Sequence, residues 1–254
     1  MDQRDLTARQ FGDNAQNYLN SPVHALGADL DRLQALARRL RPQCALDLGC
    51  GAGHAAFALA RGGALSLTAY DPSAPMLAAV VREAAARGHA QIVTRQGVAE
   101  QLPFEDASID LVVTRYSAHH WPAVPAAVNE IARVLRQGGT LVVIDVVAPE
   151  SAMLDTTLQT LELLRDSSHV RDYRASEWRS MLSAYGLTCA DSVQWKLLLE
   201  FDSWVKRIAT PARRVDALRA VMQDLPAEAR EYFAVAADGS FSSDVLWIEA
   251  CKGV

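Results

Sequence analysis

The chain has 254 residues, of which 50% are hydrophobic and 22% are charged, a composition typical of a globular protein with a full core. Its net charge of −5 gives no electrostatic reason to expect nucleic acid as a partner. The first residues are too polar for a signal peptide, and no apolar run approaches the ~20 residues that span a bilayer. A soluble cytoplasmic protein without a membrane span is therefore expected.

The N-terminal segment and the first strands set the pattern of the chain. Phe11 and Tyr18 share a helical face, and leucines from 26 to 40 at helical spacing predict an amphipathic helix over residues 24–40. Strands are then expected over 44–48, 65–71, 90–96, 109–116 and 140–147, and helices over 52–61, 72–87 and 124–135, the last ended by Gly138 and Gly139. Alternating strands and helices predict a parallel sheet covered by helices on both faces.

Beyond residue 149 strands and helices no longer alternate regularly. Helices are expected over 151–164, 175–184, 201–208, 212–223 and 227–236, an extended segment over 187–199 and a closing strand over 241–251. These helices are too many for simple crossovers, so we expect a lid over the strand ends. We predict a single domain with an N-terminal helical cap (1–41), a cofactor-binding core (42–148), a helical lid with sheet elements (149–238) and a C-terminal strand (239–254).

The four cysteines show no metal-ligand spacing, so no metal site is predicted. Cys44 and Cys251 lie in apolar runs and are expected to be buried thiols. Cys50 lies within a glycine-rich turn, where a small side chain is tolerated.

This turn follows the first strand and carries Gly49, Gly51 and Gly53, which let the backbone bend sharply and approach a ligand closely. Dinucleotide folds use G-x-G-x-x-G, but here the spacing is G-x-G-x-G and the next residue is the bulky His54. Asp47 before the turn would repel a pyrophosphate and suit an ammonium or sulfonium ligand. Asp47, Asp71, Tyr116 and Asp145 all fall near strand ends, where ligands of such sheets bind.

The glycine-rich turn is part of the first of six motifs that follow one another along the chain, at residues 46–53, 70–71, 96–104, 109–113, 118–121 and 134–139. Together they resemble class I S-adenosylmethionine-dependent methyltransferases of the ubiquinone/menaquinone-biosynthesis-like (methyltransferase type 11) group. The resemblance implies an α/β, Rossmann-like, doubly wound and mostly parallel seven-stranded sheet, with an antiparallel C-terminal strand and a helical lid.

The resemblance also implies a set of residues that bind S-adenosyl-L-methionine. Asp71 would accept hydrogen bonds from both ribose hydroxyls, and the backbone at Ala99 would read the adenine edge. The family usually has Asp where Val98 stands, so one polar contact to adenine is missing and weaker cofactor binding is expected. The full predicted set is Tyr18, Asp47, Gly49, Cys50, Gly51, Gly53, Asp71, Pro72, Ser73, Val98, Ala99, Glu100, Arg115 and Tyr116.

The implied reaction is methyl transfer to a small-molecule acceptor, phenolic, quinol-like or another small metabolite, at carbon or oxygen, by a monomer or homodimer. The alternatives are a non-catalytic S-adenosylmethionine-binding protein and, with less support, an NAD(P)-dependent oxidoreductase. His119 and His120 follow the fourth strand and are candidates for a catalytic base, or else contact Trp121 and the loop backbone.

Other side chains carry two interpretations each. Asp145 is a base or a structural partner, and His24 and His169 either roof the pocket or only pack. Arg171 and Arg207 are candidate anion contacts, although an exposed helix face explains both. Five aromatic side chains either line a pocket for an aromatic acceptor or form the core of the lid: Tyr173, Trp178, Trp195, Phe201 and Trp204.

Overall fold

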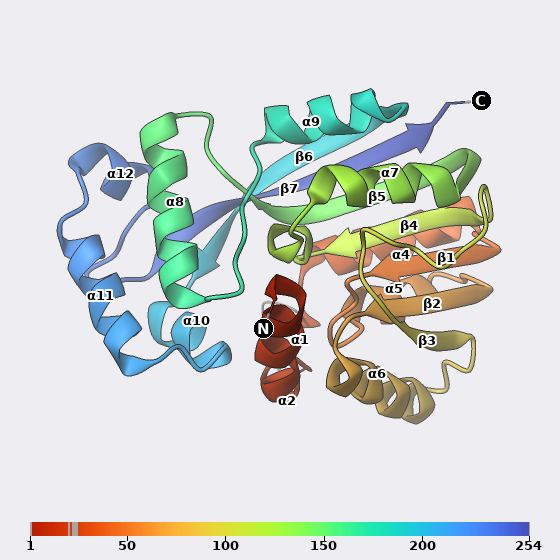
Figure 1. Cartoon of the computed structure of the whole chain (residues 1–254), viewed down its shortest axis with the longest axis horizontal. Coiled ribbons are helices and arrows are strands. Elements are labelled where there is room, and N and C mark those ends of the chain that lie inside the picture. The colour runs from red at the N-terminus through yellow and green to blue at the C-terminus, as the bar shows by residue number, and fades with distance from the viewer. Residues whose placement is uncertain (1, 20, 22–24, 254) are drawn as a thin grey trace.

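The structure, a computed structural model, describes residues 2–19, 21 and 25–253. Its centre is a seven-stranded sheet in the order β3-β2-β1-β4-β5-β7-β6, in which β7 pairs antiparallel with both neighbours and the other pairs are parallel (Figure 1). The predicted α/β fold is therefore confirmed. The strands are β1 (Cys44–Leu48), β2 (Ser66–Asp71), β3 (Ile92–Gln96), β4 (Ile109–Arg115), β5 (Leu135–Val147), β6 (Leu187–Leu199) and β7 (Phe241–Lys252).

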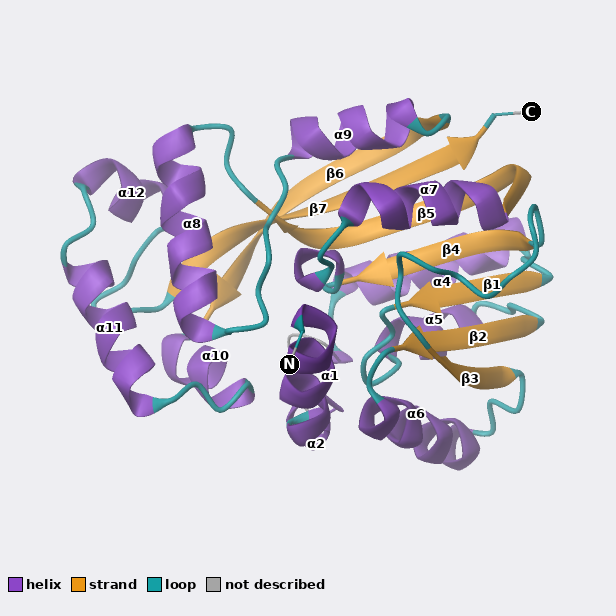
Figure 2. Cartoon of the chain, viewed as in Figure 1, coloured by secondary structure: helices purple, strands orange, loops and turns teal. Residues whose placement is uncertain are grey.

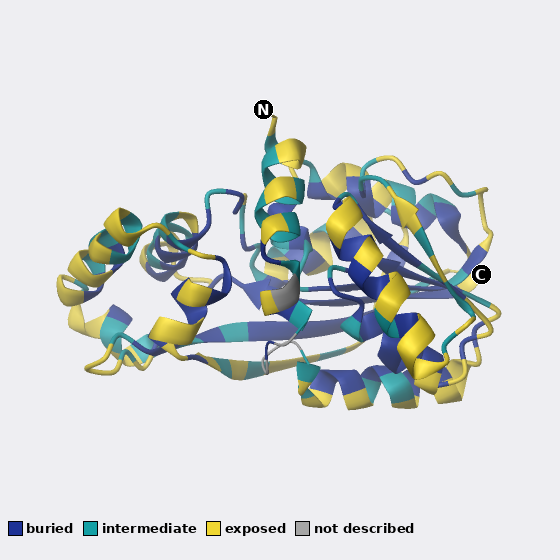
Figure 3. Cartoon of the chain, turned by 90° about the horizontal axis from the view of Figure 1, so that it is seen from below, coloured by how far each residue is buried: buried dark blue, intermediate teal, exposed yellow. Residues whose placement is uncertain are grey.

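Helices cover both faces of this sheet (Figure 2). One face packs against α4 (Ala28–Leu40), α5 (His54–Arg61) and α6 (Ala74–Arg87), and the other against α7 (Val124–Val134) and α9 (Ala175–Ala184). In α4 the buried side chains Leu30, Leu33 and Leu36 face the core. Each such leucine contributes about 1.5–3 kcal/mol of burial free energy. Figure 3 shows buried residues along the strands and exposed ones on the outer faces of the helices.

Some expected boundaries were wrong. The first long helix begins at Ala28 after the N-cap Gly27, which leaves Leu26 outside it and 82% exposed, whereas His24 lies outside the described residues. Helix α7 ends at Val134, because Leu135 already pairs with Ile109 of β4, and Gly138 and Gly139 lie within β5. Regular pairing resumes at Thr140, where the strand was expected to begin. Cys44 and Cys251 are only partly buried, whereas Cys50 is buried.

The lid is built on the two strands at the edge of the sheet. β7 pairs with β5 over 244–251, but its first residues, from Phe241, pair only with the end of β6. Figure 1 shows these strand ends running beyond the core sheet into a group of helices. The helices are α8 (Ala152–Arg165), α10 (Phe201–Arg207), α11 (Ala212–Gln223) and α12 (Ala227–Tyr232), packed around buried Phe201, Trp204, Phe233 and Phe241.

The N-terminal helices α1 (Gln3–Asp13) and α2 (Ala15–Leu19) lie between this lid and the core (Figure 1). Gln10 donates a hydrogen bond to the Ile208 carbonyl (2.9 Å), and Gln3 donates one to the Ser168 carbonyl (2.6 Å). On the other side, both helices contact α6. No helix among the described residues is long and apolar enough to cross a membrane.

Candidate active site

The glycine-rich turn joins β1 to α5 at the carboxyl edge of the sheet. The Gly49 and Cys50 N–H groups both donate to the Tyr70 carbonyl, at 2.8 and 3.1 Å, so the turn is tied to the end of β2. Gly49 has φ +70°, and a Cβ there would overlap the Ser117 side chain. Gly51 has φ +48°, and a Cβ there would meet no atom within 4 Å. Gly51 therefore leaves open space above the backbone, as a ligand resting on the turn requires, whereas the missing Cβ of Gly49 makes room for Ser117.

Asp71 fixes the shape of this turn from the end of β2. Its Oδ2 accepts a hydrogen bond from Gly51 N–H (2.9 Å), and its Oδ1 accepts one from Ser73 N–H (2.8 Å). Burial raises the pKa of the Asp71 carboxyl to about 6, against the lowering effect of these two bonds. Each oxygen keeps a second lone pair, so the carboxylate can accept further hydrogen bonds from a ligand.

Asp47 has a different task. Its Oδ2 accepts from the Ala56 N–H (2.8 Å), one of the free donors in the first turn of α5. Burial raises the pKa of Asp47 to about 7. This carboxyl therefore stabilises the start of α5.

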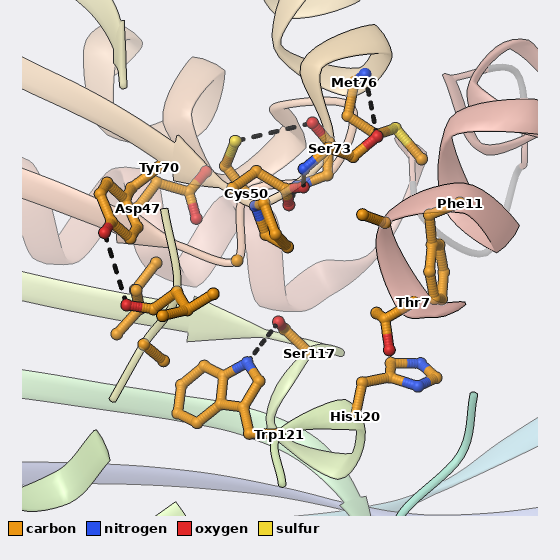
Figure 4. A pocket seen from close by; sticks show the side chains of 18 of the residues that line it. Thr7, Phe11, Asp47, Cys50, Tyr70, Ser73, Met76, Ser117, His120 and Trp121 are labelled. Atoms are coloured by element: carbon orange, nitrogen blue, oxygen red, sulfur yellow. Dashed lines mark hydrogen bonds between the residues drawn. The ribbon is translucent and has the colours of Figure 1, made fainter. Parts of the chain in front are cut away.

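A cavity opens above the turn, with about 990 Å³ of empty space that includes its mouth to solvent. In Figure 4, Asp47, Cys50 and Ser73 stand on one side of it, with Ser117 and Trp121 across from them. The structure brings the predicted set together here, with one exception. The lining includes Tyr18, Asp47, Gly49, Cys50, Gly51, Asp71, Pro72, Ser73, Val98, Ala99, Glu100, Arg115, Tyr116 and His120.

Gly53 is the exception. It is the N-cap of α5 at φ +86°, and a Cβ would lie 3.0 Å from Val80 Cγ2 and 3.2 Å from Phe57 Cζ. Its small size thus permits close packing of α5 on α6, away from the cavity.

Helix α1 closes one end of the cavity, and the sequence indicated only part of this wall. Arg4, Thr7 and Phe11 all line it, but only Phe11 was marked in advance, by its shared face with Tyr18. Arg4 lies 3.6 Å from the Glu100 carboxylate, which ties α1 to the loop after β3. Arg4 and Thr7 have no distinguishing sequence signal, because their position depends on how α1 folds back over the core.

The two candidate histidines follow β4 in a short 3-10 helix, η1 (Ala118–His120), and differ in charge. His119 Nδ1 lies 2.6 Å from Asp145 Oδ1. Burial lowers the pKa of His119, but the Asp145 carboxylate outweighs it and the result is about 9. His119 is therefore protonated at neutral pH, and Asp145 is its structural partner.

His120 is held neutral. Burial lowers its pKa to about 4, and the charge on His119 adds to this effect. Its Nδ1 lies 3.0 Å from the Ser168 carbonyl, which fixes the tautomer with Nδ1 as donor. The Phe11 ring packs edge-on at 4.7 Å between ring centroids.

A second cavity adjoins the first under the lid, with about 510 Å³ of empty space that includes its mouth to solvent. The two share one wall, made by Phe11, Tyr18, Tyr116 and His120. The rest of the lining comes from the core and the lid: His119, Val146, Glu162, Arg165, Asp172, Leu197, Leu199, Trp204 and Arg207.

The remaining candidates divide between the cavities and the scaffold. Arg207 is buried in the second cavity, so the exposed-helix interpretation was wrong for it. Arg171 pairs with Asp155 and Glu177, and His169 Nε2 bonds Gln159 at 2.9 Å. Of the aromatic candidates, Trp204 lines the second cavity, whereas Tyr173, Trp178, Trp195 and Phe201 line neither cavity and pack in or against the hydrophobic core. Within the described part of the chain, no group of three or more His, Cys, Asp or Glu residues is placed to hold a metal ion.

Comparison with known proteins decides the family. Residues 46–143 match the family described as Methyltransferase domain. The uncharacterized methyltransferase YcgJ of Bacillus subtilis is 38% identical over 225 residues, 89% of this chain and 88% of its own. The chain belongs to the methyltransferase family.

Structure and further relatives agree with this assignment. The crystal structure of YcgJ superposes on this methyltransferase with a TM-score of 0.82 at 35% identity, covering 87% of this chain and 98% of the other. The uncharacterized Escherichia coli protein YafE is 47% identical over 187 residues, 74% of this chain and 90% of its own. The ubiquinone/menaquinone biosynthesis C-methyltransferase UbiE of Rubrivivax gelatinosus is 36% identical over 104 residues, 41% of this chain and 39% of its own.

Proposed function

We propose that this methyltransferase binds S-adenosyl-L-methionine in the first cavity and transfers its sulfonium methyl group to a small molecule held in the second. The observation that carries the proposal is the Asp71 carboxylate, fixed by Gly51 and Ser73 at the strand end where a ribose would lie. Rigid acceptors at a strand end are suited to a vicinal pair of hydroxyls.

The remaining lining fits the other parts of the cofactor. Tyr70 O–H reaches the Val98 and Gln101 carbonyls at 3.4 and 3.3 Å, which steadies the loop that presents Ala99 to adenine. At the other end of the cavity Tyr18 and Arg115 line the place expected for the methionine group. Arg115 forms an ion pair with Asp29 and stacks on Tyr116, so its side chain is held in position.

The cofactor supplies an electrophilic methyl group, so the protein has mainly to position the acceptor and exclude water. The shared wall of Phe11, Tyr18, Tyr116 and His120 is where a methyl carbon would pass between the cavities. The C–S bond breaks as the bond from the acceptor nucleophile to carbon forms, and a phenol or an activated ring carbon must also lose a proton.

His120 is the better candidate to receive that proton. His119 already carries one at neutral pH, whereas His120 is neutral and lines both cavities. The Asp166 Oδ2 lies 3.9 Å from His120 Nε2, so a buried carboxylate stands near the imidazolium that would form.

Two measurements test the function. Isothermal titration calorimetry should show binding of S-adenosylhomocysteine but not of NAD, and the reverse result would favour the oxidoreductase alternative. Incubation with S-adenosylmethionine and a panel of phenolic and quinol acceptors should release S-adenosylhomocysteine. Cofactor binding without turnover on any acceptor would favour a non-catalytic binding protein.

A further inference from the structure

The second cavity contains a buried cation whose charged group has no hydrogen-bond or ion-pair partner among the described residues. Arg207, at the end of α10, is only 9% exposed and lines the cavity. In the described part of the chain its guanidinium takes part in no hydrogen bond or ion pair; only its backbone carbonyl accepts one, from Asn17 (3.3 Å). A buried guanidinium without a counter-ion is costly, which makes this group a binding site for an anion.

A second arginine stands nearby and is already engaged. Arg165, at the end of α8, donates to the Trp204 carbonyl (3.2 Å) and to the Tyr18 hydroxyl (3.5 Å), and lies 3.7 Å from Glu162. Burial lowers the pKa of the Arg207 guanidinium, and the positive charge of Arg165 adds to this. Arg165 therefore adds to the positive potential around Arg207 but is fixed in place, which leaves Arg207 to bind the ligand.

Two acidic side chains also face the cavity. Glu162 lies 3.7 Å from Arg165, whose charge offsets its own, and burial raises the pKa of the Asp172 carboxyl well above its usual value, which favours its neutral, hydrogen-bond-donating form. Asp172 is 1% exposed, and within the described residues its Oδ2 has no hydrogen-bond partner, with His169 Nε2 3.8 Å away. A protonated Asp172 would thus donate to a ligand oxygen.

The rest of the lining suits a compact apolar body. Val146, Leu197, Leu199 and Trp204 contribute apolar surface to this cavity, which is partly open to solvent. An apolar lining with a few polar groups to orient a ligand is typical of a small-molecule site.

We propose that the methyl acceptor of this enzyme carries a carboxylate or phosphate group, which Arg207 binds with Arg165 beside it. The body of the acceptor lies on the apolar lining, and its nucleophilic atom lies against the wall shared with the cofactor cavity. This inference rests on the proposed function, since it treats the second cavity as the acceptor site.

Ligand binding to the full chain, saturated with S-adenosylhomocysteine and followed by NMR, tests the inference. The probes share a phenol ring and differ in one group: 4-hydroxybenzoate, hydroquinone monophosphate, 4-hydroxybenzamide and 4-(aminomethyl)phenol. We expect the two acids to bind at least about tenfold more tightly than the amide and the amine. Neither the neutral amide nor the cationic amine can form an ion pair with the Arg207 guanidinium. The tighter of the two acids identifies the anionic group.

Substitution assigns the preference to Arg207. In Arg207→Gln the acids should lose their advantage while S-adenosylhomocysteine affinity stays within about twofold, and Arg207→Lys, which keeps the charge, should retain part of it. Arg213→Gln removes an exposed charge from the neighbouring helix α11 and should behave as wild type.

The inference is overturned if the amide or the amine binds wild type as tightly as the acids, if none of the acids binds, or if Arg207→Gln keeps the preference. Failure of S-adenosylhomocysteine itself to bind wild type would contradict the proposed function first, and the acceptor inference with it.

Discussion

Replacing Asp71 with Asn is the sharpest perturbation of the proposed cofactor site, because it changes one oxygen atom and little volume. Both carboxylate oxygens accept backbone hydrogen bonds, from Gly51 and Ser73. An amide has only one acceptor oxygen, so one of these N–H groups would face an NH₂ donor, and one ribose hydroxyl would lose its acceptor.

The expected magnitude follows from these lost contacts. A hydrogen bond to a charged group contributes about 1.5–3 kcal/mol, so losing one in the turn and weakening one to ribose should reduce binding by about 3 kcal/mol. This corresponds to an increase of about 100-fold in the Kd of S-adenosylhomocysteine, measured by calorimetry.

Asp110 provides a matched control at the opposite end of β1. Its Oδ2 accepts hydrogen bonds from the Gln43 and Cys44 N–H groups, at 2.6 and 2.9 Å, so Asp110→Asn makes the same chemical change far from the turn. This variant should lose stability but keep its affinity. Equal loss of affinity in both variants, or unchanged affinity in Asp71→Asn, would refute the role given to Asp71.

Three further predictions concern single side chains. Val98→Asp should tighten S-adenosylhomocysteine binding by about tenfold in calorimetry, because it adds a carboxylate acceptor at the adenine edge; weaker binding would show that adenine lies elsewhere. Gly49→Ala should abolish measurable binding and lower the Tm, since its Cβ overlaps Ser117 at φ +70°. A variant that binds normally would show that the turn tolerates a side chain at this position. In urea titrations, wild type should exceed His119→Gln by about 3 kcal/mol below pH 6.5 and lose this advantage as pH rises through about 9, because the Asp145 pair raises the folded-state pKa of His119. A difference that grows with pH would have the wrong sign.

The parts of the site that sequence predicts are those fixed by local backbone geometry. Gly49, Gly51 and Asp71 lie within short motifs whose spacing on a strand and turn leaves few alternatives, and the structure places all three at the cavity. Gly53 shares the motif but faces α6, because the turn has become a helix N-cap by that point.

Side chains that reach the site through tertiary folding gave much weaker signals. Arg207 ends a helix whose exposed face would explain an arginine, but the tertiary packing of α10 buries it, and Asn17 of α2 donates a hydrogen bond to its carbonyl. Likewise, Arg171 was equally plausible as an anion contact, yet Asp155 and Glu177 occupy it. A sequence shows the charge of an arginine but not whether a carboxylate from another element neutralises it.

A crystal structure of the full chain with S-adenosylhomocysteine bound would test the central claim most directly. We predict that both ribose hydroxyls lie within hydrogen-bond distance of the Asp71 carboxylate and that the sulfur faces the wall shared by Phe11, Tyr18, Tyr116 and His120, toward the second cavity. A ligand whose ribose lies away from Asp71, or whose sulfur faces away from that wall, would contradict it.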